Sequence, residues 1–135
     1  MSELNRKIQP SISPLKNLDL LLPTRSCFPN GARFTLLEKS VQEEVFRLDI
    51  LVHGGQLRQK QSLQSRLTSK MLSEGTLTMS QQEISDSLDR YGAWMGTSSG
   101  LKTITINLFS LNRYANETLS VLEKILKEPS FPEKQ

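Results

Sequence analysis

The sequence is poor in the residues that build disulfides and catalytic metal centres. Its 135 residues include one cysteine, Cys27, and one histidine, His53. A single cysteine excludes an internal disulfide framework, and we expect Cys27 to be a small buried residue. A hydrolytic zinc needs about three protein ligands, which one histidine and one cysteine do not supply. His53 ends an apolar strand, so we interpret it as a structural residue, and triad chemistry is not expected.

Long hydrophobic runs and phosphate-binding glycine motifs are also missing. No apolar run approaches the roughly 18 residues of a membrane span, and the first residues lack the apolar core of a signal peptide. We therefore expect a soluble protein without a membrane span, and the cytoplasm is the favoured compartment. Gly54 and Gly55 are not followed by the residues of a Walker motif, and Gly96 and Gly100 lack Rossmann spacing, which argues against nucleotide binding.

The charge balance does not indicate a particular binding partner. The chain has 17 Lys and Arg against 14 Asp and Glu, a formal charge of +3. The short basic segment 58–61, RQKQ, has no interleaved aromatic residues, so we interpret it as a solvated loop. A nucleic-acid or anionic surface binder using Arg58, Lys60, Arg66 and Lys70 is the weakest hypothesis, and we expect no nucleic-acid partner.

The chain divides at its first turn signal. Residues 1–29 contain four of the six prolines, which favour an extended lead-in, and Asn30-Gly31 predicts a turn. Residues 30–135 then form the domain. Two strands are predicted at 33–38 and 44–52, paired antiparallel through a short polar link around Ser40.

The rest of the chain predicts three helices and two further strands. The first helix carries an apolar stripe and stops at Gly75, and the second begins with the capping box of Ser80 and Glu83 and stops at Gly92. The third begins near Asn112 and ends before Pro129. Strands are predicted at 93–99 and 101–110. The apolar stripe of the first helix consists of Leu63, Leu67, Met71 and Leu72. The stripe of the third helix consists of Ala115, Leu119, Leu122, Ile125 and Leu126.

This order, strand-strand-helix-helix-strand-strand-helix, predicts an α+β fold. The strands form a layered, largely antiparallel sheet, and the helices pack on one face because each amphipathic element must bury its apolar stripe. Ile104, Ile106 and Leu108 alternate with polar residues and are predicted to point into the core.

Several segments together resemble one family. They are NGARFTLLEK from Asn30, RLDILVHGG from Arg47, MLSEGT from Met71, EISDSLDRYGAWMGTSS from Glu83 and LSVLEKILKEPSF from Leu119. In this order and spacing they are similar to the N-terminal part of the pitrilysin, insulinase and mitochondrial processing peptidase family of zinc metallopeptidases. The resemblance covers residues 30–131 and implies a metallohydrolase-like fold and a link to proteolysis.

The resemblance also implies where the family's chemistry would lie. Active members carry an inverted zinc motif, His-x-x-Glu-His, just before the segment that MLSEGT matches. Counting back from Gly75 places its positions on Arg66, Ser69 and Lys70. Two cations and a serine neither bind zinc nor act as general base, so we predict no catalytic residue, no metal ligand and no cofactor. The family's third ligand, a glutamate, would fall beyond Gln135.

The leading hypothesis is a non-catalytic module of this family. Such a module pairs with a catalytic subunit or binds extended peptide, and the resemblance implies a peptide-pairing strand at Met95, Gly96, Thr97 and Ser98. A strand with a purely structural role is the alternative for these residues. Gly96 would allow another backbone to approach closely.

Two further expectations follow from the resemblance. The alternative function is a fragment of an active zinc metalloendopeptidase whose ligands lie elsewhere in the full protein or in a partner. Because the family's domain is longer, residues 30–135 look truncated at the C-terminus, and uncovered apolar surface predicts self-association or contact with a partner.

Overall fold

A computed structural model describes residues 20–38 and 44–131. The chain forms two compact units, Met1–Val41 and Gln42–Gln135. The division into a lead-in of residues 1–29 and a domain from residue 30 stays a prediction.

The first unit contains a β-hairpin. Strand β1 (Thr24–Cys27) pairs antiparallel with strand β2 (Arg33–Leu36). The turn follows the predicted signal: Gly31 has a φ of 83°, which glycine adopts without steric cost, and the Asn30 Oδ1 accepts a hydrogen bond of 3.0 Å from the Ala32 N–H. The turn residues therefore fix a local hairpin.

The predicted pairing of the first two strands was wrong. β2 pairs with β1, whereas strand β3 (Val45–Val52) pairs antiparallel with strand β5 (Ile104–Leu111). The tight Asn30-Gly31 turn offers β2 a partner close in sequence, and β1 was too short and too polar to be recognised as a strand. Cys27 lies exposed on β1, so the expectation that it is buried was also wrong.

The second unit is built on a three-stranded antiparallel sheet. Its strand order is β3-β5-β4, with strand β4 spanning Trp94–Ser99. The register places Leu48 opposite Leu108 and Leu108 opposite Met95, so these three side chains share one face. β5 is the central strand, and β4 is an edge of this sheet in the part of the chain that the structure describes.

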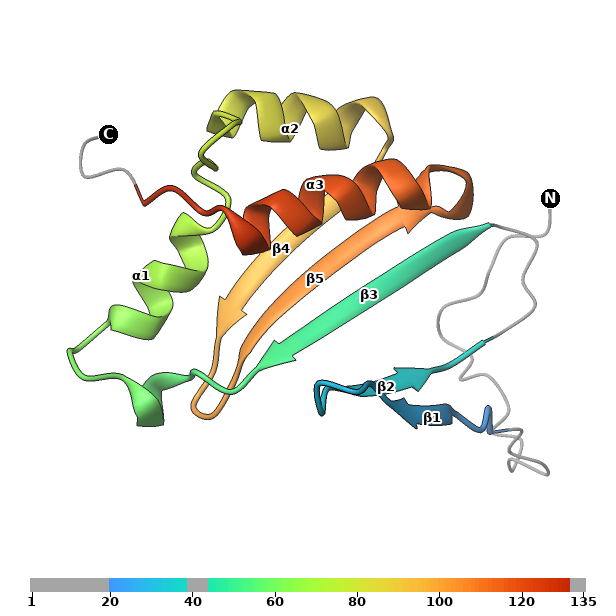
Figure 1. The fold of residues 1–135 in the computed structure, drawn as a ribbon, viewed down its shortest axis with the longest axis horizontal. Coiled ribbons are helices and arrows are strands. Elements are labelled where there is room, and N and C mark those ends of the chain that lie inside the picture. The colour runs from blue at the N-terminus through green and yellow to red at the C-terminus, as the bar shows by residue number, and fades with distance from the viewer. Residues whose placement is uncertain (1–19, 39–43, 132–135) are drawn as a thin grey trace, which may run out of the picture. The chain divides into compact units, whose positions relative to one another are not determined.

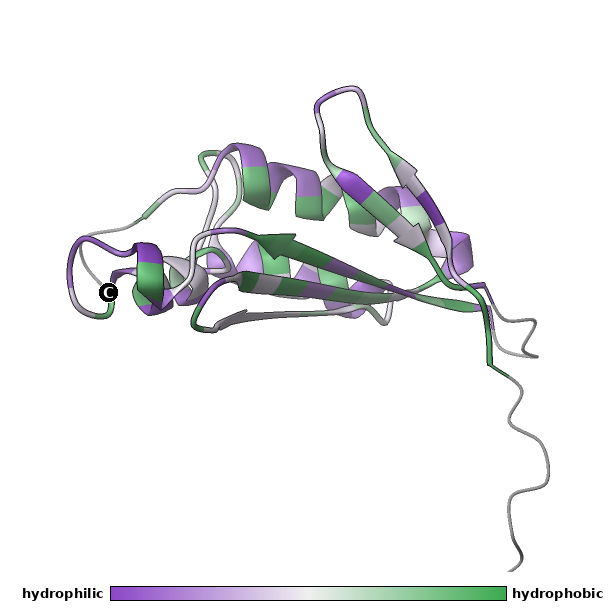
Figure 2. Cartoon of the chain, turned by 90° about the horizontal axis from the view of Figure 1, so that it is seen from below, coloured by the Kyte–Doolittle hydropathy of each residue, from purple (hydrophilic) through white to green (hydrophobic). Residues whose placement is uncertain are grey.

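Three helices accompany the sheet. They are α1 (Gln64–Met71), α2 (Gln81–Arg90) and α3 (Ala115–Lys127), and short 3-10 turns at Gln56–Arg58 and Asn112–Tyr114 precede α1 and α3. In Figure 1 α3 runs across the sheet and α2 lies beside it, while α1 lies next to the far end of β4. Figure 2 shows the helices with apolar and polar stripes, as expected for helices that cover an apolar layer.

Helix α2 begins with the predicted capping box. The Ser80 Oγ accepts a hydrogen bond from the Glu83 N–H at 3.3 Å, and the Glu83 carboxylate accepts one from the Ser80 N–H at 2.8 Å. These two bonds satisfy main-chain donors that have no partner inside the helix. The main-chain N–H of Ser80, and then its hydroxyl, hold the pKa of Glu83 below its ordinary value. The helix ends at Arg90, and Gly92, whose φ is +59°, turns the chain away two residues later.

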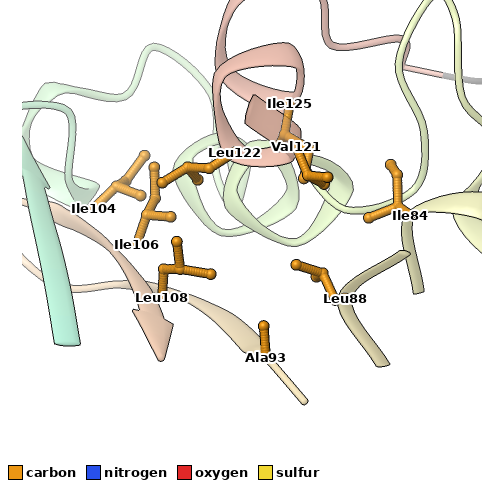
Figure 3. Close-up of a cluster of buried hydrophobic side chains, with 9 residues drawn as sticks. All are labelled: Ile84, Leu88, Ala93, Ile104, Ile106, Leu108, Val121, Leu122 and Ile125. Carbon is orange, nitrogen blue, oxygen red and sulfur yellow. The ribbon is translucent and has the colours of Figure 1, made fainter. Parts of the chain in front are cut away.

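The core lies between β5, α2 and α3. β5 contributes the predicted residues Ile104, Ile106 and Leu108, and Leu108 is completely buried. Each such apolar side chain contributes roughly 1.5–3 kcal/mol relative to exposure. Figure 3 shows the cluster, which consists of Ile84, Leu88, Ala93, Ile104, Ile106, Leu108, Val121, Leu122 and Ile125.

The buried stripe of α3 differs in part from the predicted one. Leu122 and Ile125 are buried as expected, but Leu119 and Leu126 are 38% and 37% exposed. Thr118 is buried instead, and its hydroxyl donates to the carbonyl of Tyr114 at 2.9 Å. The apolar pattern did not include Thr118 because threonine is polar. Its hydroxyl is hydrogen-bonded to the main chain of the preceding turn, so the side chain can be buried like a small apolar one. The predicted α+β fold with an antiparallel sheet and helices on one face is confirmed.

Candidate functional site

Helix α1 packs on β4 through small hydroxyl side chains. Ser65 and Ser69 are 4% and 1% exposed. The Thr97 Oγ1 donates to the main-chain carbonyl of Ser69 at 2.7 Å, and the Ser99 Oγ donates to the Ser65 Oγ at 2.9 Å. We call these four residues the α1–β4 seam. Serines at the contact let the helix lie close enough for its main chain to bond a strand side chain.

The apolar stripe predicted for α1 does not face the core. Leu63 and Leu67 are each 54% exposed. A separation of two residues is a rotation of about 200° on a helix, so with Ser65 and Ser69 against β4 the leucines lie on the opposite side. Leu72, just after the helix, is the member of the stripe that packs on the core. The prediction failed because the contact with β4 selects small side chains over apolar ones.

The start of α1 is held by glutamine side chains. Leu63 precedes the helix with a φ of 66°, a conformation that costs a non-glycine residue about 1–2 kcal/mol. The Gln64 Oε1 accepts a hydrogen bond from the Lys60 N–H at 2.9 Å, and the Gln59 Oε1 accepts one from the Ser65 Oγ at 3.2 Å. The loop before α1 is therefore tied to both the helix and the seam.

The residues matching the zinc motif fall on this helix but do not fit a metal. Arg66 and Lys70 are exposed, whereas Ser69 is buried and its hydroxyl donates to the carbonyl of Arg66 at 2.9 Å. Zinc ligands must offer a lone pair, which the cationic side chains do not, and a serine hydroxyl is no substitute for a carboxylate base. Within residues 20–38 and 44–131 no three His, Cys, Asp or Glu side chains cluster closely enough to hold a metal. His53 lies exposed after β3.

The predicted peptide-pairing residues, Met95 to Ser98, lie on β4. In an antiparallel pair each strand turns half of its main-chain N–H and C=O groups toward its neighbour and half away. β5 bonds one side of β4, and no further strand pairs with the other side in the described residues. The side chain of Thr97 is already engaged with α1, so the seam covers the C-terminal half of β4 more closely than the half that begins at Trp94.

Gly96 has a structural role that the sequence did not indicate. A Cβ at this position would lie 2.6 Å from the Cη2 of Trp94, because the indole lies across the glycine. The indole also contacts Phe109, with 5.4 Å between ring centroids, and the Arg47 guanidinium lies 5.0 Å from the centroid of Phe109. The sheet face toward which a Cβ of Gly96 would point is therefore occupied by the indole, whereas the edge of β4 lies to the side of it.

The exposed sheet face carries a polar network that the sequence did not indicate. The Asp49 Oδ1 accepts hydrogen bonds from the Arg47 Nε at 2.8 Å and the Asn107 Nδ2 at 2.6 Å. The bond from Arg47, and then that from Asn107, lower the pKa of Asp49 below its ordinary value. The alternation of polar residues along 45–52 and 104–111 is the signal that would have placed these residues on one face, but only the pairing of β3 with β5 joins them.

A groove lies between α2 and the start of β4. Its volume is about 290 Å³. Ile84, Leu88 and Ala93 contribute buried apolar side chains to its lining, and Met95 extends the lining along the strand. Asp89 on α2 is the one ionisable residue of the lining. Sites for drug-sized ligands span about 300–1,000 Å³, so this groove lies just below that range and has room for a side chain. We call it the α2–β4 groove.

Comparison with known proteins gives matches to solved structures alone. No protein-family model and no curated protein matches the sequence. The fold is similar to the peptidase M16 inactive domain from Pseudomonas fluorescens, with a TM-score of 0.75 and 21% identity over 84% of this chain and 28% of that one. It is also similar to the periplasmic protease PqqL from Escherichia coli, with a TM-score of 0.74 and 14% identity over 96% of this chain and 16% of that one. A protease from Helicobacter pylori matches with a TM-score of 0.73 and 12% identity over 85% of this chain and 28% of that one.

These likenesses confirm the fold that the sequence resemblance predicts. The chain has the fold of part of a pitrilysin-like, M16-type peptidase domain and spans less than a third of the length of each of the three structures. Identities of 12–21% establish a shared fold and not a shared activity. No helix in the described residues is both long and apolar enough to cross a membrane.

Proposed function

We propose that this chain is a zinc-free, non-catalytic module with the pitrilysin-like fold, which holds an extended peptide along β4 while a catalytic partner carries out hydrolysis. The observation that carries the proposal is that Ser69 is buried and hydrogen-bonded within its own helix. It matches the family's general base, yet it is a serine that is 1% exposed and hydrogen-bonded within α1. A general base must reach a water molecule and accept its proton, and this side chain does neither.

The charges around Ser69 support the same conclusion. Arg66 carries a guanidinium group, and the ammonium group of Lys70 adds a second positive charge on the same helix. A Zn²⁺ ion brought to these two positions would be repelled rather than coordinated. Hydrolysis by this fold therefore requires metal ligands from another chain or from another part of the polypeptide.

The position of β4 supports the peptide-binding part of the proposal. An extended peptide added to the edge of a sheet gains main-chain hydrogen bonds irrespective of its sequence, and alternate side chains then meet the surface beside the strand. On β4 the side chains of Met95 and Thr97 point to the core face, and that of Ser98 points to the opposite face, where Gly96 presents no side chain. The open half of the edge, from Trp94 to Gly96, is where we place the peptide.

Exposed leucines on α1 and in the segment before it support a protein partner. Leu63 and Leu67 face away from β4, and Leu57 in the preceding turn is 69% exposed. Apolar side chains that gather on one surface are typical of protein contacts. We propose that this surface meets either the catalytic partner or a second copy of the chain. Light scattering over a range of protein concentrations tests self-association, and a Leu67→Ser variant should lower the apparent mass if the second copy binds here.

Metal content and peptidase activity test the non-catalytic assignment. The full-length protein is purified without chelator, its zinc is measured by mass spectrometry, and cleavage of a fluorogenic peptide is followed with and without chelator. We expect no stoichiometric zinc and no chelator-sensitive cleavage by this protein alone. An Arg66→Ala, Lys70→Ala double variant serves as the matched control.

Two outcomes separate the proposal from an active enzyme. Bound zinc together with cleavage that is lost in the Arg66→Ala, Lys70→Ala variant would place the catalytic centre on α1 and refute the proposal. Chelator-sensitive cleavage that is unchanged in this variant would identify an active peptidase whose ligands lie elsewhere in the full protein.

A further inference from the structure

The α2–β4 groove lies directly beside the open half of the β4 edge. Trp94 and Met95 belong both to the lining of the groove and to the start of that strand, and Ala93 of the lining directly precedes it. A peptide strand paired with β4 would lie about 4.8 Å from it, with its side chains alternating between the two faces of the sheet. One side chain in two would therefore share the face of Met95, which is the face on which the groove opens.

The lining of the groove suits a side chain with an apolar stem and a cationic end. Ile84 and Leu88 are 2% and 8% exposed and form an apolar floor. Polar residues, Gln81 and Ser85 of α2 and Ser73 before it, lie around this floor, and Asp89 supplies the one carboxylate. Lysine and arginine place a hydrocarbon stem on apolar surface while the charged end reaches a polar rim. Glutamate in the same place would be repelled by Asp89.

We propose that the α2–β4 groove is a specificity pocket that receives a lysine or arginine side chain of the peptide bound along β4. This inference rests on the proposed function, because the peptide must first pair with β4. The main-chain bonds to β4 supply the affinity, and Asp89 supplies the selection. Asp89 is exposed, and an ion pair at an exposed position changes binding by about two- to fivefold.

Nuclear magnetic resonance with matched peptides tests the inference. The ¹⁵N-labelled full chain is titrated with blocked pentapeptides of sequence Thr-Thr-Xaa-Thr-Thr, in which Xaa is lysine, norleucine, alanine or glutamate. Norleucine keeps the stem of lysine and lacks its charge. A peptide of the lysine sequence with alternate main-chain nitrogens methylated lacks the donors that strand pairing needs.

We expect the lysine peptide to bind about two- to fivefold more tightly than the norleucine peptide, and the glutamate peptide to bind most weakly. Amide shifts should appear at Trp94 and Met95 on the strand and at Ser85 on α2. The Asp89→Asn variant should bind the lysine and norleucine peptides equally. The matched control is Asp86→Asn, which removes a charge from α2 at a residue outside the lining, and it should keep the preference for lysine.

The outcomes distinguish the specificity pocket from the pairing of a peptide with β4. Equal binding of all four side chains, with binding lost on N-methylation, would support peptide pairing along β4 and refute the specificity pocket. A lysine preference that survives Asp89→Asn would also refute the pocket. If no peptide shifts the β4 amides, the peptide-binding part of the proposed function fails and the pocket fails with it.

Discussion

Replacing Thr97 by valine should loosen α1 from β4. The Ser69 carbonyl lies in the last turn of α1, where main-chain acceptors have no partner inside the helix. Thr97 is on another element, and its Oγ1 donates to this carbonyl at 2.7 Å. Valine has nearly the same shape as threonine and suits a strand, so Thr97→Val removes the hydrogen bond while leaving the backbone and the packing volume almost unchanged.

The expected loss in the free energy of unfolding is about 1–2 kcal/mol. A hydrogen bond contributes about 0.5–1.5 kcal/mol net, and leaving a buried acceptor without a partner raises the cost to about 1–3 kcal/mol. Ser69 is 1% exposed, so water does not easily replace the lost donor. For a domain of 60–100 residues, each kcal/mol lowers the midpoint of thermal unfolding by about 4–8 °C. Urea denaturation followed by circular dichroism gives the free energy directly.

The Thr97→Ser variant is the matched control. It keeps the hydroxyl and loses a methyl group, so its stability should stay closer to that of the natural chain. In the Thr97→Val variant, hydrogen exchange should speed up most at the amides of α1, because that helix loses one of its two bonds to β4. Equal stability of the two variants, or faster exchange spread evenly over the domain, would show that the seam does not hold α1 as argued.

Three further predictions concern the seam, the sheet face and the core. A double-mutant cycle of Ser65→Ala and Ser99→Ala should give a coupling of about 1 kcal/mol, since each change removes one side of the same 2.9 Å hydrogen bond. Asp49 should titrate below its ordinary value of 3.8, and Arg47→Ala should move the midpoint back toward that value in a carbon-detected titration. Because the folded pKa is lowered, the stabilisation from Asp49 is present above about pH 4 and is lost as the pH falls through the folded pKa, and Asp49→Asn should lack this loss. Ile125→Ala should cost about 2–5 kcal/mol in urea denaturation, because the side chain is 1% exposed and a cavity remains.

Local signals in the sequence were reliable where a few neighbouring residues decide the conformation. The capping box of Ser80 and Glu83 formed as predicted, because both of its bonds join residues three apart. The alternation in residues 104–108 identified a buried strand face, since each strand residue reverses the direction of its side chain. The turn at Asn30-Gly31 formed because glycine adopts a positive φ at little cost.

The candidate site depended on contacts between distant residues. The sequence assigned Arg66, Ser69 and Lys70 to one helix and named the strand that contains Met95, but it gave no sign that Ser69 would be buried. The apolar pattern of α1 pointed to Leu63 and Leu67, whereas the helix turned its serines toward β4. Periodicity reports which residues share a helix face, and it does not report which face meets the sheet when small side chains compete with apolar ones.

The sequence by itself therefore determined the helices, most of the strands and the α+β class. These depend on residue type and on neighbours within about one turn or one strand. Tertiary structure alone decided that β2 pairs with β1 and that β3 pairs with β5. It also decided that Ser69 is buried with its carbonyl bonded by Thr97, and that a groove lined by Asp89 opens beside the β4 edge. These features join residues far apart in the chain, so they arise only when burial of the shared core selects one arrangement of the sheet and helices.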